Sequence, residues 1–129
     1  MTSIPIHLVL DTSAVVEFTR ESIHVGEPLS EIADAGAVAV VPSLCLVEAR
    51  PFIADLDRLD LLTRHAAVAV MGVEADQWRA LAAAYETVGR LDAAAAALAA
   101  IDSESWVLTR YPGLYAGIRG RDLVIPIGE

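Results

Sequence analysis

Short apolar runs alternate with segments of helical periodicity along the whole chain. Five of these runs predict strands, at Ile6–Leu10, Val38–Val41, Ala67–Met71, Trp106–Thr109 and Leu123–Ile127. The runs are continuously apolar instead of alternating with polar residues, which is typical of strands that are buried on both faces. The pattern predicts an α/β fold with a mostly parallel five-stranded sheet and helices on both faces, as a single domain over residues 1–129.

Helical segments are expected between the strands, and glycine or proline marks several of their ends. The predicted segments are Ser13–Arg20, Glu27–Ala35, Ser43–Ala49, Phe52–Arg64, Glu74–Val88 and Asp92–Asp102, with a turn or short helix at Tyr111–Ala116. Ser43 is the expected N-cap of its helix, because its hydroxyl can accept a hydrogen bond from a free backbone amide. Pro51 is expected to break or kink that helix, and Gly89 is expected to end the long helix over Glu74–Val88.

Three carboxylates have settings that differ from an ordinary surface acid. Asp11 directly follows the first strand, at the sheet edge where open α/β sheets bind ligands. Glu48 lies on an apolar helical stripe with Leu44 and Cys45, and Asp92 begins the alanine-rich helix. Each also has an ordinary interpretation: Asp11 and Asp92 as helix caps, and Glu48 as a surface residue at the edge of its stripe. Converging carboxylates repel one another unless a cation lies among them, and carboxylate oxygens suit Mg²⁺ or Mn²⁺.

The ordered set of motifs resembles the PIN domain and, within it, the VapC-type ribonuclease toxins. The matching stretches are Leu8–Ala14, Val41–Ala49, Arg90–Ala97 and Val107–Thr109. The resemblance implies a three-layer α/β/α sandwich and a Mg²⁺-dependent (or Mn²⁺-dependent) endoribonuclease. It places Asp11, Glu48 and Asp92 at the acids that hold the metal directly or through water, with Thr12 or Ser13 positioning a water or the acid. An RNA substrate, a cognate antitoxin and a homodimer are the implied partners.

The chain departs from the family pattern after the fourth strand. The family usually has a threonine, one variable residue and an aspartate there, whereas this chain has Thr109-Arg110-Tyr111. Tyr111 thus takes the place of the fourth acid, which leaves open a one-metal nuclease, an altered activity, or a weak or inactive module that acts by binding a protein. Arg110 is either an ordinary surface residue or a phosphate contact. The candidates for a replacement acid are Glu86, Asp102 and Glu104.

Composition narrows these functions further. The net charge is −9 and all nine basic residues are arginines, which argues against broad, non-specific nucleic-acid binding but permits an acidic metal pocket. A basic protein partner is compatible with this charge, and so is a role in solubility alone. The lone Cys45 is expected to be packed in the core and not to act as a nucleophile. With no signal peptide and no apolar stretch of about 18 residues, we expect a cytoplasmic protein that does not enter a membrane. A phosphatase or phosphotransferase on a related α/β sheet is a third alternative. It would need a second aspartate in an Asp-x-Asp motif after the first strand, whereas this chain has Asp11-Thr12-Ser13.

Overall fold

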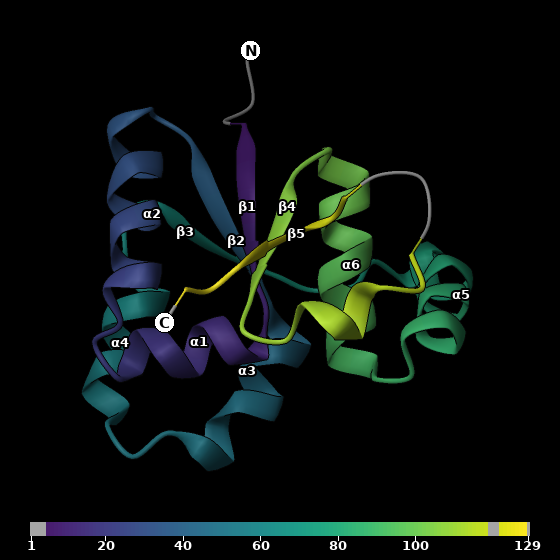
Figure 1. The fold of residues 1–129 in the computed structure, drawn as a ribbon, viewed down its shortest axis with the longest axis horizontal. Helices are drawn as coiled ribbons and strands as arrows, with labels where there is room; N and C mark the ends of the chain where they lie inside the picture. The colour runs from purple at the N-terminus through teal and green to yellow at the C-terminus, as the bar shows by residue number, and fades with distance from the viewer. Residues whose placement is uncertain (1–4, 119–121, 129) are drawn as a thin grey trace.

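A parallel sheet in the order β3-β2-β1-β4-β5 forms the middle layer (Figure 1). The computed structural model describes residues 5–118 and 122–128. The strands are β1 (Ile6–Leu10), β2 (Val38–Pro42), β3 (Val68–Met71), β4 (Trp106–Thr109) and β5 (Val124–Pro126). Every neighbouring pair is parallel. The chain proceeds from β1 to one edge and then returns to the other side of β1, so the strand order reverses between β1 and β4, where such sheets bind ligands.

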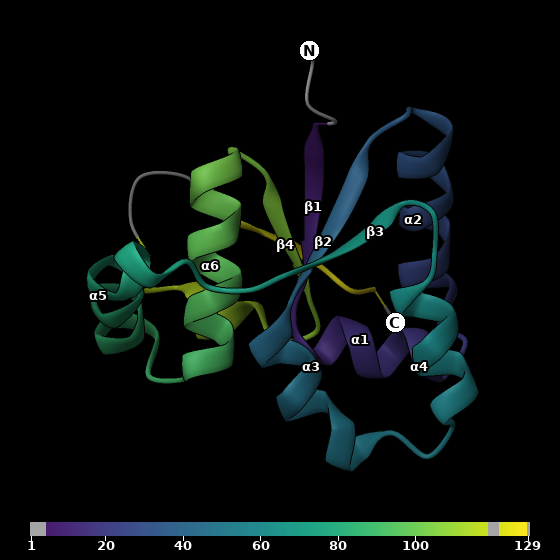
Figure 2. The ribbon, with the colours of Figure 1, turned by 180° about the vertical axis from the view of Figure 1, so that it is seen from behind.

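Helices cover both faces of this sheet, which confirms the predicted α/β/α layers (Figures 1 and 2). The α-helices are α1 (Thr12–Thr19), α2 (Ile23–Asp34), α3 (Ser43–Ala49), α4 (Leu56–Thr63), α5 (Trp78–Val88) and α6 (Leu91–Ser103). Three short 3₁₀ segments join them, η1 (Arg50–Phe52), η2 (Ala75–Gln77) and η3 (Pro112–Tyr115). Helices α2 and α4 lie on one face and α6 on the other, with α5 outside α6. None of the described helices is long and apolar enough to cross a bilayer.

Alternate residues of β1 divide the core into two parts. Leu8 and Leu10 pack with α1, α2 and α4, while Val9 points to the opposite face and packs against α6. The side of α6 that faces the sheet is built from alanines, including Ala93, Ala96, Ala97 and Ala100, all buried. Short side chains let the helix approach the strands closely while the interior stays densely packed. The alanine run is therefore a packing surface, and it fixes the position of the residues at the start of α6.

The predicted helix limits need two corrections at proline. Helix α2 begins at Ile23, earlier than the predicted Glu27, and continues through Pro28. Proline removes one helical hydrogen bond, but burial of an apolar stripe that includes Leu29 holds the segment in a helix. The N-cap of α3 is Pro42 and not Ser43, so the prediction for Ser43 is wrong. The serine occupies the first helical position instead.

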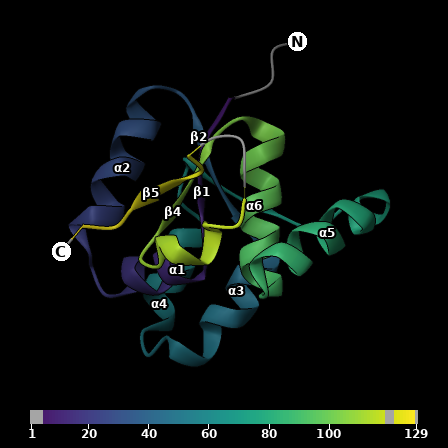
Figure 3. The same ribbon diagram turned by 45° about the vertical axis from the view of Figure 1, so that its right-hand side comes forward.

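Two further boundaries depend on local capping. The segment predicted as one helix from Phe52 to Arg64 contains the end of η1 and then α4, which begins at Leu56 because the Asp55 carboxylate accepts a hydrogen bond from the Arg58 amide at 3.2 Å. Gly89 ends α5 with a left-handed φ of 85°, as predicted. Helix α5 projects away from the sheet (Figure 3). Trp78 on α5 is 60% exposed and Trp106 on β4 is 42% exposed, so neither is a core residue.

Candidate active site

Asp11 lies at the carboxyl end of β1 and is both a helix cap and a buried carboxylate. Its Oδ1 accepts hydrogen bonds from the Ala14 amide at 3.1 Å and from the Ser13 hydroxyl at 2.6 Å, which caps α1. Its Oδ2 accepts a hydrogen bond from the Tyr115 hydroxyl at 2.8 Å. Asp11 is only 3% exposed, so a charged carboxylate there depends on these three donors. The two interpretations of Asp11 are therefore compatible, because capping uses one oxygen and leaves the other directed elsewhere.

Asp92 lies in the first turn of α6 and is buried beside the start of α1, which carries the hydroxyls of Thr12 and Ser13. Thr12 donates from its hydroxyl to Asp92 Oδ2 at 2.6 Å, which links the start of α1 to the start of α6. Arg90 approaches with two nitrogens: Nε lies 3.1 Å from Oδ1 and Nη2 lies 3.2 Å from Oδ2. The N-cap residue is Arg90 and not Asp92, so the acid is placed by the helix but does not cap it. Such a two-pronged contact is the geometry in which guanidinium recognises a carboxylate most strongly.

These contacts change the ionisation of both partners in the Arg90–Asp92 pair. Burial alone would raise the pKa of Asp92, but hydrogen bonds from Arg90 and Thr12 outweigh it, and the net pKa lies below its usual value. The hydrogen bond to Asp92 and its charge raise the pKa of Arg90, and the more distant Glu48 adds to that increase. Asp92 is therefore an anion and Arg90 a cation at all ordinary pH values.

Glu48 is placed differently from the other two predicted acids. It lies near the end of α3 with an exposed side chain, and it does not line the groove described below. Across residues 5–118 and 122–128, no three His, Cys, Asp or Glu side chains are grouped closely enough to hold a metal ion. The structure thus brings Asp11 and Asp92 together through Thr12 and Ser13, and it leaves Glu48 at a distance at which its charge still acts on Arg90. A role for Glu48 as a metal ligand stays a prediction.

Tyr115 is a site residue that the sequence analysis missed. It belongs to η3, which follows β4, and its ring is buried against Val9, Cys45 and the α6 alanines. Burial and the neighbouring Asp11 charge raise the pKa of Tyr115, which keeps its hydroxyl protonated and available as a donor. The strand order explains the contact: β4 lies next to β1, so the segment after β4 reaches the same sheet edge as Asp11. The sequence alone does not show that these strands are neighbours.

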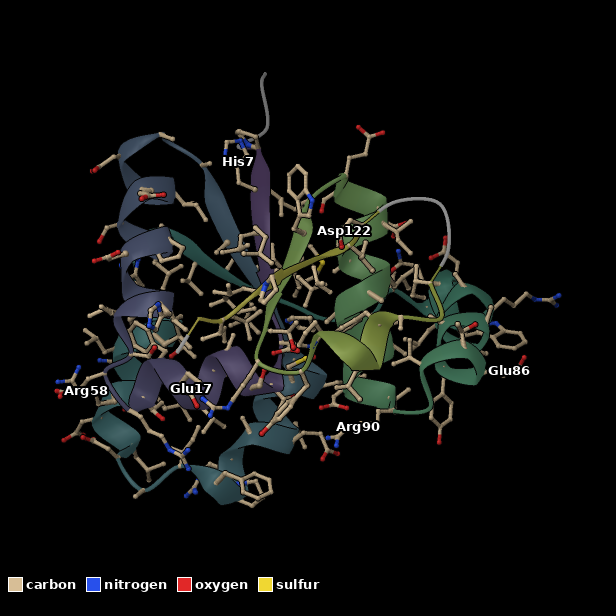
Figure 4. The ribbon with its side chains drawn as sticks, in the orientation of Figure 1. His7, Glu17, Arg58, Glu86, Arg90 and Asp122 are labelled. Atoms are coloured by element: carbon tan, nitrogen blue, oxygen red, sulfur yellow. The ribbon has the colours of Figure 1, made fainter. Side chains whose placement is uncertain are left out.

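An open groove of about 1120 Å³ runs over the two buried aspartates. It is lined by Asp11, Thr12, Ser13, Val16, Glu17, Arg20, Phe52, Arg90, Asp92, Ala93 and residues 110–115. Figure 4 shows Glu17 on α1 and Arg90 beside α6 at one end of the sheet, and His7 at the opposite end. Three arginines and three acids line this groove among the described residues, although acids outnumber basic residues two to one in the chain. The groove is thus less acidic than the protein as a whole.

The residues that directly follow β4 line this groove. Tyr111 is exposed and lines it, and Arg110 lines it as well, with its guanidinium 3.2 Å from the carboxylate of Glu17. None of the three candidate replacement acids lines the groove. Asp102 lines a separate, smaller one, and Glu86 lies on α5, far from Glu17 and Arg90 (Figure 4). Glu17, which the sequence analysis did not consider, is the third acid of this groove.

Cys45 packs beneath the site, as predicted. Its thiol is buried and donates to the backbone oxygen of Asp92 at 3.3 Å. Burial raises the pKa of the thiol to about 12, and the negative charges of Asp11 and Asp92 act in the same direction. A thiol that stays protonated is a poor nucleophile, so the contact serves to hold the start of α6 in place.

The donor set of the groove suits a divalent cation of the Mg²⁺ or Mn²⁺ type. Such ions are commonly held by one or two carboxylates, with waters and substrate phosphates completing the shell. Each carboxylate oxygen has about two acceptor sites, and Asp11 Oδ2 uses one of them for Tyr115 among the described residues. Asp11 therefore keeps a site for a cation. Asp92 supplies the second carboxylate, and the hard oxygen chemistry of both acids fits these ions.

Comparisons with known proteins support the fold. No family model matches the chain, and no curated protein matches its sequence. Among solved structures, the chain is similar to the crystal structure of VapBC2 from Rickettsia felis bound to a DNA fragment from their promoter. The TM-score is 0.64 at 12% identity, and the match covers 94% of this chain and 98% of that one. This likeness and the strand order confirm the PIN-like architecture at the level of the fold.

Proposed function

We propose that this chain is a divalent-metal-dependent endoribonuclease of the VapC type, the toxin of a type II toxin–antitoxin pair. The main support is the placement of two buried carboxylates, Asp11 and Asp92, at the base of one open groove at the carboxyl edge of the sheet. They come from distant parts of the chain and are joined through the adjacent hydroxyls of Thr12 and Ser13. Burial of two like charges side by side is costly, which favours a functional reason for keeping both.

In this proposal Asp11 and Asp92 hold the Mg²⁺ or Mn²⁺, and Glu48 contributes directly or through water. The bound ion would stabilise negative charge on the phosphoryl oxygens and activate a water for hydrolysis. Ser13 and Tyr115 orient the Asp11 carboxylate, one donor to each oxygen. Thr12 performs the same task for Asp92. Because these donors are themselves packed or part of the α1 turn, both carboxylates are held in place before substrate arrives.

The walls of the groove provide chemistry for an RNA strand. Arg20 and Arg110 line it and can approach backbone phosphates, which compensates locally for the acidic chain. Phe52 and Tyr111 also line it and are exposed, so their rings are available for stacking. Aromatic rings stack on unpaired bases, whereas the bases of a duplex are already stacked on one another. We therefore propose single-stranded RNA, or a loop of structured RNA, as the substrate.

The partners follow from the same proposal. The similar structure is VapBC2, described as bound to a DNA fragment from the promoter, which supports a cognate antitoxin as the protein partner of this chain. The net charge of −9 favours a partner segment that is basic. A homodimer remains part of the proposal on the basis of the family resemblance.

Cleavage of a defined RNA panel by the purified chain tests the function, with Mg²⁺, Mn²⁺ or EDTA present. Asp11→Asn and Asp92→Asn should each reduce the cleavage rate by about 100-fold or more, since the ion supplies several kcal/mol of charge stabilisation. Asp102→Asn is the matched control, because Asp102 is exposed, bonds to Gln77 and lies in the other groove. Asparagine keeps a cap acceptor at position 11, and thermal melts confirm that each variant folds. Cleavage at an unchanged rate in excess EDTA would contradict the proposal.

A second candidate function is a catalytically inactive PIN-like module that binds a protein. It is favoured by Tyr111 at the place of the fourth acid and by the Arg90 guanidinium on Asp92. It predicts no metal-dependent cleavage and no tight metal binding. Stoichiometric Mn²⁺ binding that is lost in Asp11→Asn would count against it.

A further inference from the structure

A cationic side chain, Arg90, contacts both oxygens of the Asp92 carboxylate, whereas the donors to Asp11 are all uncharged. Asp92 Oδ2 accepts from both Arg90 and Thr12, and its Oδ1 accepts from Arg90. A carboxylate has about four acceptor sites in total, two on each oxygen. Arg90 and Thr12 fill both sites of Oδ2, and Arg90 fills one of Oδ1, so a metal that binds through Oδ2 must first displace one of these donors.

Arg90 is the donor that can leave most readily. The side chain of Asp92 is 6% exposed and that of Arg90 is 52% exposed, so the guanidinium can move into water without leaving a cavity. Thr12, the other donor, is the first residue of α1 and follows Asp11 directly. Its backbone cannot withdraw without moving the start of that helix. Within residues 5–118 and 122–128, Arg90 is the cationic side chain that bonds to one of the two buried aspartates, Asp92.

We propose that Arg90 is a built-in competitor for the divalent cation at Asp92, and that its release sets the metal affinity of the groove. This inference rests on the proposed metal site at Asp11 and Asp92. Arg90 acts through Asp92 and is a positioning residue: it holds the carboxylate in place when no metal is bound. With the metal present, the freed guanidinium lies at the rim of the groove, where an RNA phosphate can take the place of Asp92 as its partner.

The two states differ in charge as well as in contacts. Two aspartates carry a charge of −2, and Arg90 reduces it to −1 while it is bound to Asp92. A divalent ion entering beside a guanidinium meets repulsion as well as carboxylate oxygens that Arg90 already contacts. Replacing Arg90 by a neutral residue removes both obstacles. We expect the dissociation constant for Mn²⁺ to fall by about 10-fold, which equals about 1.4 kcal/mol.

The test measures Mn²⁺ binding to the full chain without RNA. Isothermal titration calorimetry gives the dissociation constant, and electron paramagnetic resonance measures the free ion. Arg90→Gln should bind about 10-fold more tightly than wild type. Arg90→Lys, which keeps the charge but not the two-pronged contact, should lie between the two. The control is Arg58→Gln on α4, which changes the net charge equally but removes an exposed pair with Glu21, and it should bind as wild type does. Thermal melts establish that the variants are folded.

The outcomes separate this inference from the function on which it rests. If wild type binds Mn²⁺ and Asp92→Asn abolishes binding, but Arg90→Gln is unchanged or weaker, the competition by Arg90 is wrong and the metal site stands. If neither wild type nor Arg90→Gln binds Mn²⁺ and no RNA is cleaved, both proposals are wrong. An equal gain of affinity in Arg58→Gln would show a general charge effect and would also overturn the role of Arg90.

Discussion

Removal of the Tyr115 hydroxyl should destabilise the protein without changing its core packing. Tyr115 is 3% exposed, and its hydroxyl donates to Asp11 Oδ2 at 2.8 Å. Phenylalanine keeps the ring, so Tyr115→Phe removes a single hydrogen bond to a charged, buried acceptor. The two other donors to Asp11 bond to Oδ1 and cannot replace it.

The size of the effect follows from that geometry. A hydrogen bond to a charged group contributes about 1.5–3 kcal/mol, and we expect Tyr115→Phe to lower the free energy of unfolding by about 2 kcal/mol. For a chain of 129 residues this corresponds to a decrease in melting temperature of about 7 °C. The loss should shrink in Mg²⁺, because a bound cation stabilises the same carboxylate and favours the folded state.

Urea denaturation followed by circular dichroism, at neutral pH and in EDTA, measures this difference. Tyr85→Phe is the matched control, since Tyr85 lies on α5 and is half exposed, and its change should stay below about 0.5 kcal/mol. Stability within about 0.5 kcal/mol of wild type for Tyr115→Phe would refute the view that the hydroxyl supports the Asp11 charge. An equal loss in both variants would refute it as well.

Two further predictions concern acid stability and RNA binding. Because the pKa of Asp92 is lowered in the folded state, its contribution to stability is present above its unfolded pKa and is lost as pH falls through the folded value. The stability difference between wild type and Asp92→Asn should therefore shrink as pH falls below about 4, the ordinary aspartate pKa, and a constant difference in urea melts would contradict this. Phe52→Ala and Tyr111→Ala should each weaken binding of a single-stranded RNA by about 5-fold to 100-fold in a fluorescence anisotropy assay, as expected for loss of a stacked base. Trp78→Ala, an exposed aromatic on α5 outside the groove, should leave RNA affinity unchanged, and an equal loss there would point to non-specific contacts.

The strands were the most predictable part of the fold because their signal is local. The limits of β1 and β4 agree with the predicted runs, since the apolar residues stop before Asp11 in one case and at Thr109 in the other. The start of α2 could not be predicted, because Pro28 disfavours a helix around it. Only the burial of residues such as Val25 and Leu29 favours the helix there. Strand order is likewise a property of the whole sheet and has no signature in any one segment.

Sequence patterns single out Asp11 and Asp92, but not the side chains that contact them. Asp11 and Asp92 stand at the junctions of strand and helix, which sequence patterns reveal. The contact of Arg90 with Asp92 depends on the extended backbone of Arg90 just before α6, which directs the guanidinium back along the helix start. The contact of Tyr115 with Asp11 depends on β4 lying beside β1. Predicting either contact requires knowledge of backbone direction or of strand order. An arginine before a helix, or a tyrosine after a strand, does not by itself indicate a role in a site.

The groove holds a third acid, Glu17, that the sequence pattern does not single out. The candidate replacements for an acid at Tyr111 were Glu86, Asp102 and Glu104, which all precede Tyr111 in the chain, and none of them lines the groove. The acid that lies there, Glu17, is four residues after Ser13 on α1, so the two side chains share one face of that helix. Ser13 bonds to Asp11 and to the backbone amide of Arg110, whose guanidinium reaches Glu17. The carboxylate of Glu17 therefore lies on the helix that follows β1, and the segment that follows β4 supplies its arginine partner.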